Sequence, residues 1–509
     1  MSAPTFDLGK LHGGLRLPSE KSASTSRPII EVPLPGQLVL PLAQHVGDPA
    51  QPMVGIGEKV LKGQLIAMFD GVIGAPVHAP TSGKIVAIEP WPVSRRRGDK
   101  APCIVIECDG EDRAVEQAEA ILDYQQLAAE DLQQQILRGG IVGLGGAVFP
   151  TAQKLMQAVT GPLEHLILNG VECEPYISCD DMLMREYAKD VLQGGQILMH
   201  ALNIASCLVV LESDKPEALE SMETALTELG DERMVIKQVP TIYPSGGEDQ
   251  LVQLVTNREV PSGGLPSDVG CVVQNVGTAA AVHRWINQGE PLISRITTVT
   301  GDGIAEPCNV LARFGTALED VVKVAGGYTE RAATMIIGGP MCGKSVNTDA
   351  VPLVKATNCV LVLSELPSVG AEMPCIRCGD CAAVCPVQLL PQQLFFYACA
   401  DNEAKLRDFG LIDCIECGCC DLVCPSHIPL TADFRNAKAR MRELADEKAR
   451  AERARQRFES RNERVRKERI ERESELATQK QTAREAGPSA IADILKRAKK
   501  DTKPMDEDP

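Results

Sequence analysis

Two runs of cysteines near the C-terminal end carry the most specific chemical signal in this chain of 509 residues. Each run has the spacing C-x2-C-x2-C-x3-C and is closed by a proline. Three closely spaced thiolates can hold three corners of a cubic iron–sulfur cluster, while the cysteine before the proline serves a second cluster. The two runs therefore predict two neighbouring [4Fe–4S] clusters, a pair that moves single electrons.

Each cluster is expected to take three ligands from one run and the fourth from the other. Cys419 stands out of register and is expected to be a neighbour of the ligands rather than a ligand. Two zinc sites are the alternative, although zinc sites usually pair two C-x2-C units. The predicted ligands are Cys375, Cys378, Cys381 and Cys424 for the first cluster, and Cys414, Cys417, Cys420 and Cys385 for the second.

A glycine-rich loop over residues 138–154 is the second candidate site. Glycines let the backbone approach a ligand closely, free amides can hold a phosphate, and Lys154 could supply the countercharge. A plain structural turn is the alternative for this loop taken alone. Three further segments are polar and contain glycine, and they could face the same pocket. They are residues 169–176, which lie at the end of a predicted strand, and the turns 243–249 and 274–278.

The elements that must position these residues predict a multidomain chain of α/β and β architecture. Helical stretches over 114–137 and 180–202 alternate with β-branched runs, which favours a Rossmann-like domain with a largely parallel sheet. A helix with Thr316 as its N-cap is expected after a strand pair. The expected domains are an N-terminal segment (1–34), a barrel-sandwich, lipoyl-like domain (35–115), the α/β domain (116–290), a β-grasp domain (291–364), an α-helical two-cluster ferredoxin domain (365–435) and a charged helical tail (436–509).

Charge and composition exclude several classes of function. The stretch 431–509 has 22 basic and 17 acidic residues, so residues 1–430 hold a net charge of −22. An acidic body of this kind is not expected to bind nucleic acid. The N-terminus has no secretory signal pattern, and no apolar run is long enough to span a membrane. Nineteen cysteines in such a chain indicate metal ligation in a reducing compartment rather than disulfides.

With these motifs in this order, the chain resembles the C subunit of the Rnf (Rsx) ion-translocating electron-transport complex over residues 11–430, including His12-Gly13-Gly14-Leu15. The α/β and β-grasp parts also resemble the flavin-binding subunit of respiratory complex I. That family's pattern "G-R-G-G-A-G-F-P-T-G-x-K" binds FMN, and its "N-A-D-E-S-E-P" corresponds to the segment 169–175. The residues that the resemblance implies as contacts of non-covalently bound FMN are Gly143, Gly145, Gly146, Ala147, Phe149, Lys154, Asn169, Glu172, Tyr243, Glu248, Asn275 and Thr278.

By the same resemblance, Glu174 and Phe149 help to seat the nicotinamide cofactor, with Glu174 positioning the site of hydride transfer. Three positions depart from the complex I pattern. Val171 replaces an aspartate, Leu144 replaces an arginine, and Gly247 replaces a glutamate. The Val171 replacement removes one polar contact that the pattern implies.

The resemblance implies a peripheral, NADH-dependent oxidoreductase subunit on the cytoplasmic face of a bacterial inner membrane. A hydride from NADH would reach FMN, and single electrons would pass through both clusters to membrane and soluble partner subunits. The complex would couple NADH and ferredoxin (or flavodoxin) chemistry to ion movement. The alternatives are an electron-transfer adaptor without its own NADH site, and part of a complex that reduces a redox-sensing regulator.

Overall fold

The computed structural model describes residues 9–94, 99–116, 121, 123–158, 161–365 and 370–485, together with residues 487, 492, 493 and 496. The chain divides into two compact units, Met1–Arg435 and Asn436–Pro509. Most of the region beyond residue 485, within the predicted tail, lies outside the described residues.

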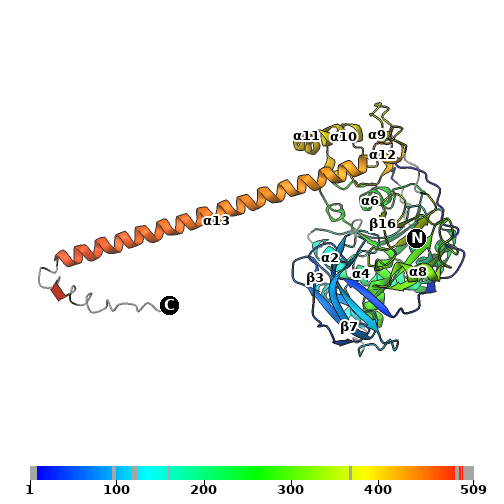
Figure 1. Cartoon of the computed structure of the whole chain (residues 1–509), viewed down its shortest axis with the longest axis horizontal. Helices are drawn as coiled ribbons and strands as arrows, with labels where there is room; N and C mark the ends of the chain where they lie inside the picture. The colour runs from blue at the N-terminus through cyan, green and yellow to red at the C-terminus, as the bar shows by residue number, and fades with distance from the viewer. Residues whose placement is uncertain are drawn as a thin grey trace. The chain divides into compact units, whose positions relative to one another are not determined.

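Two antiparallel sheets form the first globular part, drawn in blue in Figure 1. Their order is β2-β8-β7-β4 and β3-β5-β6. Short strands, glycine turns and an aliphatic interior that includes Ile66, Ile85 and Ile104 are what a barrel sandwich requires. The strands are β2 (Gln37–Pro41), β3 (Ala50–Pro52), β4 (Lys59–Val60), β5 (Leu65–Phe69), β6 (Val77–His78), β7 (Gly83–Pro92) and β8 (Lys100–Cys108).

A four-stranded parallel sheet of order β11-β10-β9-β12 forms the next part, as the alternating pattern predicts. Every residue of β10 is buried, because helices cover a parallel sheet on both faces. The strands are β9 (His165–Gly170), β10 (Cys207–Glu212), β11 (Met234–Val239) and β12 (Cys271–Asn275). The helices are α1 (Ala129–Arg138), α2 (Thr151–Ala158), α3 (Cys179–Glu186), α4 (Ala188–Leu202), α5 (Pro216–Leu229), α6 (Glu248–Thr256) and α7 (Val276–Gln288), with short 3-10 turns η1 (Tyr124–Gln126) and η2 (Pro266–Val269).

A mixed six-stranded sheet of order β1-β14-β13-β17-β15-β16 completes the α/β and β core. The hairpin β13–β14 and the parallel pair β13–β17 flank α8, as in a β-grasp domain. The N-terminal strand β1 joins this sheet beside β14, a pairing that the sequence does not predict. The elements are β1 (Ile30–Glu31), β13 (Ser294–Thr300), β14 (Cys308–Arg313), α8 (Leu318–Val324), β15 (Thr334–Ile337), β16 (Lys344–Val346) and β17 (Cys359–Leu363).

Short helices surround the cysteine runs, and one long helix follows them. The short elements are α9 (Asp380–Ala383), α10 (Pro391–Cys399), α11 (Glu403–Asp408), η3 (Leu411–Asp413) and α12 (Cys419–Leu422). Helix α13 (Leu430–Glu485) is continuous (Figure 1) and is rich in i,i+4 ion pairs such as Arg455–Glu459. No helix among the described residues is long and apolar enough to cross a lipid bilayer.

Three predicted helical features are wrong in detail. Of the helix expected over 114–137, the structure shows α1 from Ala129, whereas Val115 pairs its backbone with Lys62 of the barrel sandwich. Residues 117–120 and 122 of that range lie outside the described residues. The helix expected over 180–202 is broken at Tyr187, whose ring lies under the Arg284 guanidinium at 4.9 Å. Thr316 is not an N-cap. Its carbonyl accepts a hydrogen bond from Leu353, and α8 begins after Ala317.

Candidate functional site

A cavity of about 470 Å³ lies at the carboxyl ends of β9 and β12. Its volume is in the range of small-molecule sites, and this edge of a parallel sheet is where open α/β folds bind ligands. We call it the flavin pocket, after the cofactor that the sequence predicts there. Predicted cofactor residues that line it are Gly145, Asn169, Glu172, Glu174, Tyr243, Glu248 and Asn275.

The remaining predicted residues shape the glycine-rich loop rather than line this cavity. The Phe149 carbonyl accepts a hydrogen bond from the Gly143 amide at 2.9 Å, which closes the loop. The buried Thr278 hydroxyl accepts one from the Leu144 amide at 2.9 Å and ties the loop to α7. Ala147 lies in the same loop, and Gly146 lines an adjacent cavity.

That adjacent cavity, of about 510 Å³, shares four residues with the flavin pocket: Gly145, Glu174, Cys342 and Asn358. Gly146 has φ +111°, and a side chain there would project into open space. A ligand can therefore approach the backbone of this loop closely, which is the property that the glycines predict.

Lys154 has protein partners in this structure. Its ammonium donates to a Glu248 carboxylate oxygen at 2.6 Å and to the Val273 carbonyl at 2.6 Å. The predicted countercharge is therefore held at the rim of the pocket by Glu248, which itself lines the cavity.

The two asparagines at the strand ends hold neighbouring loops in place. The Asn169 amide donates to the Gly246 carbonyl at 3.0 Å and its oxygen accepts from the Val171 amide at 3.1 Å. Asn275 caps α7, since its oxygen accepts from the Gly277 amide at 2.8 Å. Both side chains thus fix the walls of the pocket that they line.

Glu172 adopts a left-handed backbone conformation, with φ 49°, after the end of β9. Its two carboxylate oxygens accept from the Asp180 and Asp181 amides at 2.7 and 3.2 Å, at the start of α3. An acidic group is stabilised at the N-terminus of a helix. The Lys21 ammonium, from the N-terminal segment, donates to the Glu172 carbonyl.

Glu174 is held by the β-grasp domain. One of its oxygens accepts from the Met341 and Cys342 amides, each at 2.8 Å. A Cβ atom at Gly339 would stand 2.5 Å from this carboxylate, so a larger residue there would force Glu174 to move. Burial raises the pKa of Glu174. The carboxylate therefore borders both cavities in a fixed position, as a positioning residue would.

Tyr243 connects the flavin pocket to the second cysteine run. Its hydroxyl donates to the Cys417 carbonyl at 2.7 Å and lies 3.2 Å from the Cys342 sulfur. Ile415 and Cys417 line the flavin pocket themselves. A cofactor in this pocket would lie beside the second predicted cluster.

The four predicted ligands of the first cluster line one small cavity together. Cys424 reaches it from the second run, beside the three cysteines of the first. Four thiols converging from two runs fit the donor set of a [4Fe–4S] cluster. The cysteines are Cys375, Cys378, Cys381 and Cys424.

The second predicted ligand set is also brought together. Cys385 interacts electrostatically with Cys417, and Cys420 with both Cys417 and Cys414. Cys419 is fully buried beside them, and its hydrogen bond with Cys417 lowers the pKa of Cys417 to about 7. This arrangement agrees with Cys419 as a neighbour that supports the ligands.

The two runs have the same local conformation. Gly379 and Gly418, with φ of 90° and 76°, precede equivalent four-residue helices, α9 and α12. Arg377 and Glu416, which directly precede the second cysteine of each run, have φ of 58° and 57°. The left-handed residues let each run turn its three thiols towards one point.

Several residues near the site have no signal in local sequence spacing. Asp180, Cys342 and Asn358 line the flavin pocket, and Lys21 reaches Glu172 from far along the chain. Only the tertiary fold brings them there. At the three positions that differ from the complex I pattern, Val171 and Leu144 are buried, and Gly247 lines the pocket.

Three family models match this chain. Residues 9–111 match the RnfC barrel sandwich hybrid domain, 136–284 the Nuo51 FMN-binding domain and 296–345 the SLBB domain. These matches confirm the predicted barrel-sandwich, flavin-type α/β and β-grasp parts. A crystal structure of an NAD+-reducing [NiFe]-hydrogenase is a weaker match, with 19% identity and a TM-score of 0.45 over 63% of each chain.

Curated relatives are described as the C subunit of an ion-translocating oxidoreductase complex. The Pseudomonas aeruginosa protein is 48% identical over 91% of this chain and 60% of its own length. The Vibrio cholerae protein is 43% identical over 96% of this chain and 63% of its own length. The Haemophilus influenzae protein is 42% identical over 91% of this chain and 70% of its own length. The chain thus spans about three fifths of the first relatives' length, and it belongs to the family of C subunits of ion-translocating oxidoreductase complexes.

Proposed function

We propose that this chain is the electron-input subunit of an ion-translocating NADH:ferredoxin (or flavodoxin) oxidoreductase, with NADH as its substrate. Electrons would enter at FMN and leave through two [4Fe–4S] clusters. One observation carries the proposal: a single cavity is lined by six of the twelve predicted FMN residues and by Ile415 and Cys417 of the second cysteine run. A two-electron site and a one-electron site are then neighbours in one chain.

The residues present fit FMN in volume and in donor chemistry. FMN, when bound, can accept two electrons as a hydride and release them one at a time. The protein's part is to bind and orient. Asn169, Asn275 and Tyr243 hold the walls, the glycine-rich loop exposes its backbone, and Lys154 with Glu248 sets the charge at the rim.

The NADH site has narrower support. Glu174 borders both cavities and is fixed by two backbone amides, which suits a residue that positions a nicotinamide. Phe149 contributes its backbone to the loop, so a role of its ring in seating NADH rests on the family resemblance.

The family supports a place in a larger assembly. We propose that other subunits of the same complex, membrane-bound and soluble, accept the electrons. The chain would be a peripheral subunit on the cytoplasmic face of a bacterial inner membrane.

An anaerobic NADH titration tests the proposal. The full chain is reconstituted with iron, sulfide and FMN, and flavin absorbance is followed as NADH is added. The proposal predicts that NADH bleaches the flavin. Flavin that dithionite reduces but NADH does not would contradict the NADH site and favour an electron-transfer adaptor, the role that the Val171 and Leu144 substitutions leave open.

A further inference from the structure

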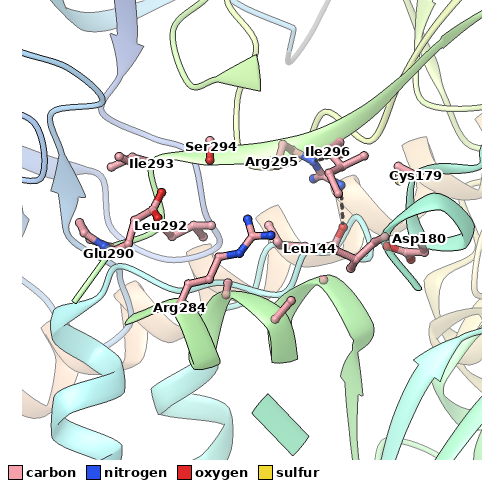
Figure 2. A pocket seen from close by; sticks show the side chains of 15 residues that line it. Leu144, Cys179, Asp180, Arg284, Glu290, Leu292, Ile293, Ser294, Arg295 and Ile296 are labelled. Carbon is pink, nitrogen blue, oxygen red and sulfur yellow. Dashed lines mark hydrogen bonds between the residues drawn. The ribbon is translucent and has the colours of Figure 1, made fainter. Parts of the chain in front are cut away.

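A smaller cavity lies between α3, α7 and β13 (Figure 2). Asp180 borders it and also lines the flavin pocket. The volume of the smaller cavity is about 40 Å³. One buried water needs on the order of 10–15 Å³ of free volume, so the cavity has room for two or three. We call it the side cavity. Residues that line it are Cys179, Asp180, Arg284, Glu290, Ser294 and Arg295, with aliphatic neighbours.

Asp180 is the one residue that lines both the side cavity and the flavin pocket, among the pocket-lining residues that the structure describes. The residue is half-buried. Figure 2 shows it at the end of the side cavity opposite Glu290. The carboxyl group therefore borders two spaces rather than filling a core.

The hydrogen bonds of Asp180 leave one oxygen for a proton. The Asn275 amide donates to Oδ2 at 2.6 Å. Within the described part of the chain, Oδ1 has no hydrogen-bond partner. The Asp180 backbone amide donates a hydrogen bond to the Glu172 carboxylate at 2.7 Å. One carboxylate oxygen each of Glu172 and Asp180 and the sulfur of Cys179 lie within 4.8 Å of one another.

The surrounding charges favour an Asp180 that exchanges its proton near neutral pH. Burial, followed by repulsion from the Glu172 carboxylate, raises the pKa of Asp180 to about 7. The Asn275 hydrogen bond and the positive charges of Arg295 and Lys215 oppose this shift. The titratable and charged groups on α3, α7, β13 and the adjoining segments are Glu172, Cys179, Asp181, Arg185, Glu186, Lys215, His283, Arg284, Glu290 and Arg295.

Reduction of a flavin by a hydride donor requires one further proton. The hydride brings two electrons and one proton, and the second proton must come from the protein or from water. Both protons leave again when the two electrons pass singly to the clusters. With FMN and NADH in the flavin pocket, the side cavity would be the space from which water could reach Asp180.

We propose that Asp180 is the proton relay of the flavin site, taking protons from water in the side cavity and passing them to the flavin. This inference rests on the proposed function. When FMN is bound, Asp180 would give its O–H proton to the flavin as the hydride arrives, and a water of the side cavity would reprotonate the Asp180 carboxylate. On reoxidation Asp180 would accept the two flavin protons one after the other and release each to that water, so protons and electrons balance.

The first test needs no flavin. Infrared titration of the full chain should show a carboxyl band that titrates near pH 7, is absent in Asp180→Asn and is retained in Asp181→Asn. Asp181 is the matched control, because it is the next residue of α3, lines neither cavity and is paired with Arg185. An unchanged band in Asp180→Asn would overturn the proposal.

The second test follows proton uptake with a pH indicator while bound FMN is photoreduced, so that NADH is not required. General acid–base groups contribute on the order of 10²–10⁴-fold, and uptake in Asp180→Asn should slow by at least about tenfold. Asp181→Asn should keep the wild-type rate and both variants should bind FMN. Equal rates in wild type and Asp180→Asn would overturn the relay.

A third variant keeps the test valid if Asp180→Asn does not fold. Ala280→Leu places a larger side chain in the side cavity and leaves the carboxyl group intact. It should slow proton uptake and keep the infrared band, and an unchanged uptake rate would contradict the route. A chain that binds no FMN would contradict the proposed function itself, whereas normal FMN binding with unaltered proton uptake contradicts the relay alone.

Discussion

At the scale of residues, the cysteine spacing and the tertiary structure describe the same arrangement. The spacing predicts that Cys424 completes the set of the first run, and the two segments do meet at one small cavity. Ligand roles follow from the chemistry of four converging thiols. They remain predictions that iron content can test.

Replacing one ligand should remove one cluster. Cys378→Ser takes a thiolate from the first set, so iron should fall from about eight to about four atoms per chain. Cys419→Ser should keep all the iron, because the spacing predicts that Cys419 is a neighbour of the ligands and not a ligand. Iron and sulfide analysis of reconstituted protein measures this, with the exposed Cys399→Ser as the matched control. Loss of iron in Cys419→Ser would show that the ligand set is different.

The sequence pattern predicts where the flavin pocket lies, but it does not predict which contacts each of its residues makes. Asn169, Glu172 and Tyr243 lie on one cavity because the carboxyl ends of parallel strands meet at one edge. Lys154 and Thr278 were predicted by the same pattern but have protein partners, Glu248 and Leu144. Partners that are distant in sequence cannot be read from spacing, which is why these roles were not predictable.

At the scale of elements, the N-terminal segment joins the cysteine region to the α/β domain. The Gly14 amide donates to the Val384 carbonyl at 2.9 Å, and Leu15 pairs with Tyr243. Gly13 has φ +55°, and a Cβ atom there would stand 2.6 Å from the Val384 backbone. The predicted motif His12-Gly13-Gly14-Leu15 thus has a structural reason, since only glycine allows this close approach.

Gly13→Ala should therefore disturb the second cluster. The added Cβ would press on Val384 and Cys385, and Cys385 is a predicted ligand of that cluster. We expect reconstituted Gly13→Ala to hold less iron and to exchange amide hydrogens faster near residue 385. Gly36→Ala is the control, because a Cβ there meets nothing within 4 Å. Equal iron content in both variants would contradict this role of the segment.

The β-grasp domain holds the glycine-rich loop with two buried cations. The Lys355 ammonium donates to the Gly140 carbonyl at 2.7 Å and to the Pro76 carbonyl at 3.2 Å. The Arg295 guanidinium donates to the Leu144 carbonyl at 3.2 Å. These contacts hold the loop in place between three domains. The sequence pattern does not predict that Lys355 or Arg295 would bind the loop.

Lys355 should make stability depend on pH. Burial lowers its pKa from 10.5 to about 7. Between these values the unfolded chain holds more protons at this position than the folded chain, so stability should rise with pH across the window. Thermal unfolding of cluster-free Lys355→Met should show a smaller rise than wild type. The exposed Lys84→Met is the control, and identical pH profiles for Lys355→Met and wild type would contradict the assignment.

At the scale of the whole molecule, domain order was predictable and the contacts between domains were not. Helical stretches that alternate with β-branched runs predict the parallel sheet, and a resemblance to lipoyl-like domains implies the barrel sandwich. The pairing of β1 with β14, and the approach of Cys417 to the flavin pocket, join segments far apart in the chain. No local pattern encodes such pairings.

The order of electron transfer tests the central claim most directly. The second cysteine run borders the flavin pocket and the first ligand cavity shares no residue with it, within the described lining sets. Bound FMN is photoreduced in Cys378→Ser and in Cys414→Ser, and freeze-quench EPR follows the cluster that remains. We predict that the second cluster is reduced at the wild-type rate in Cys378→Ser, whereas reduction of the first cluster in Cys414→Ser is strongly slowed. Wild-type reduction of the first cluster in Cys414→Ser would contradict a path that runs from the flavin pocket through the second cluster.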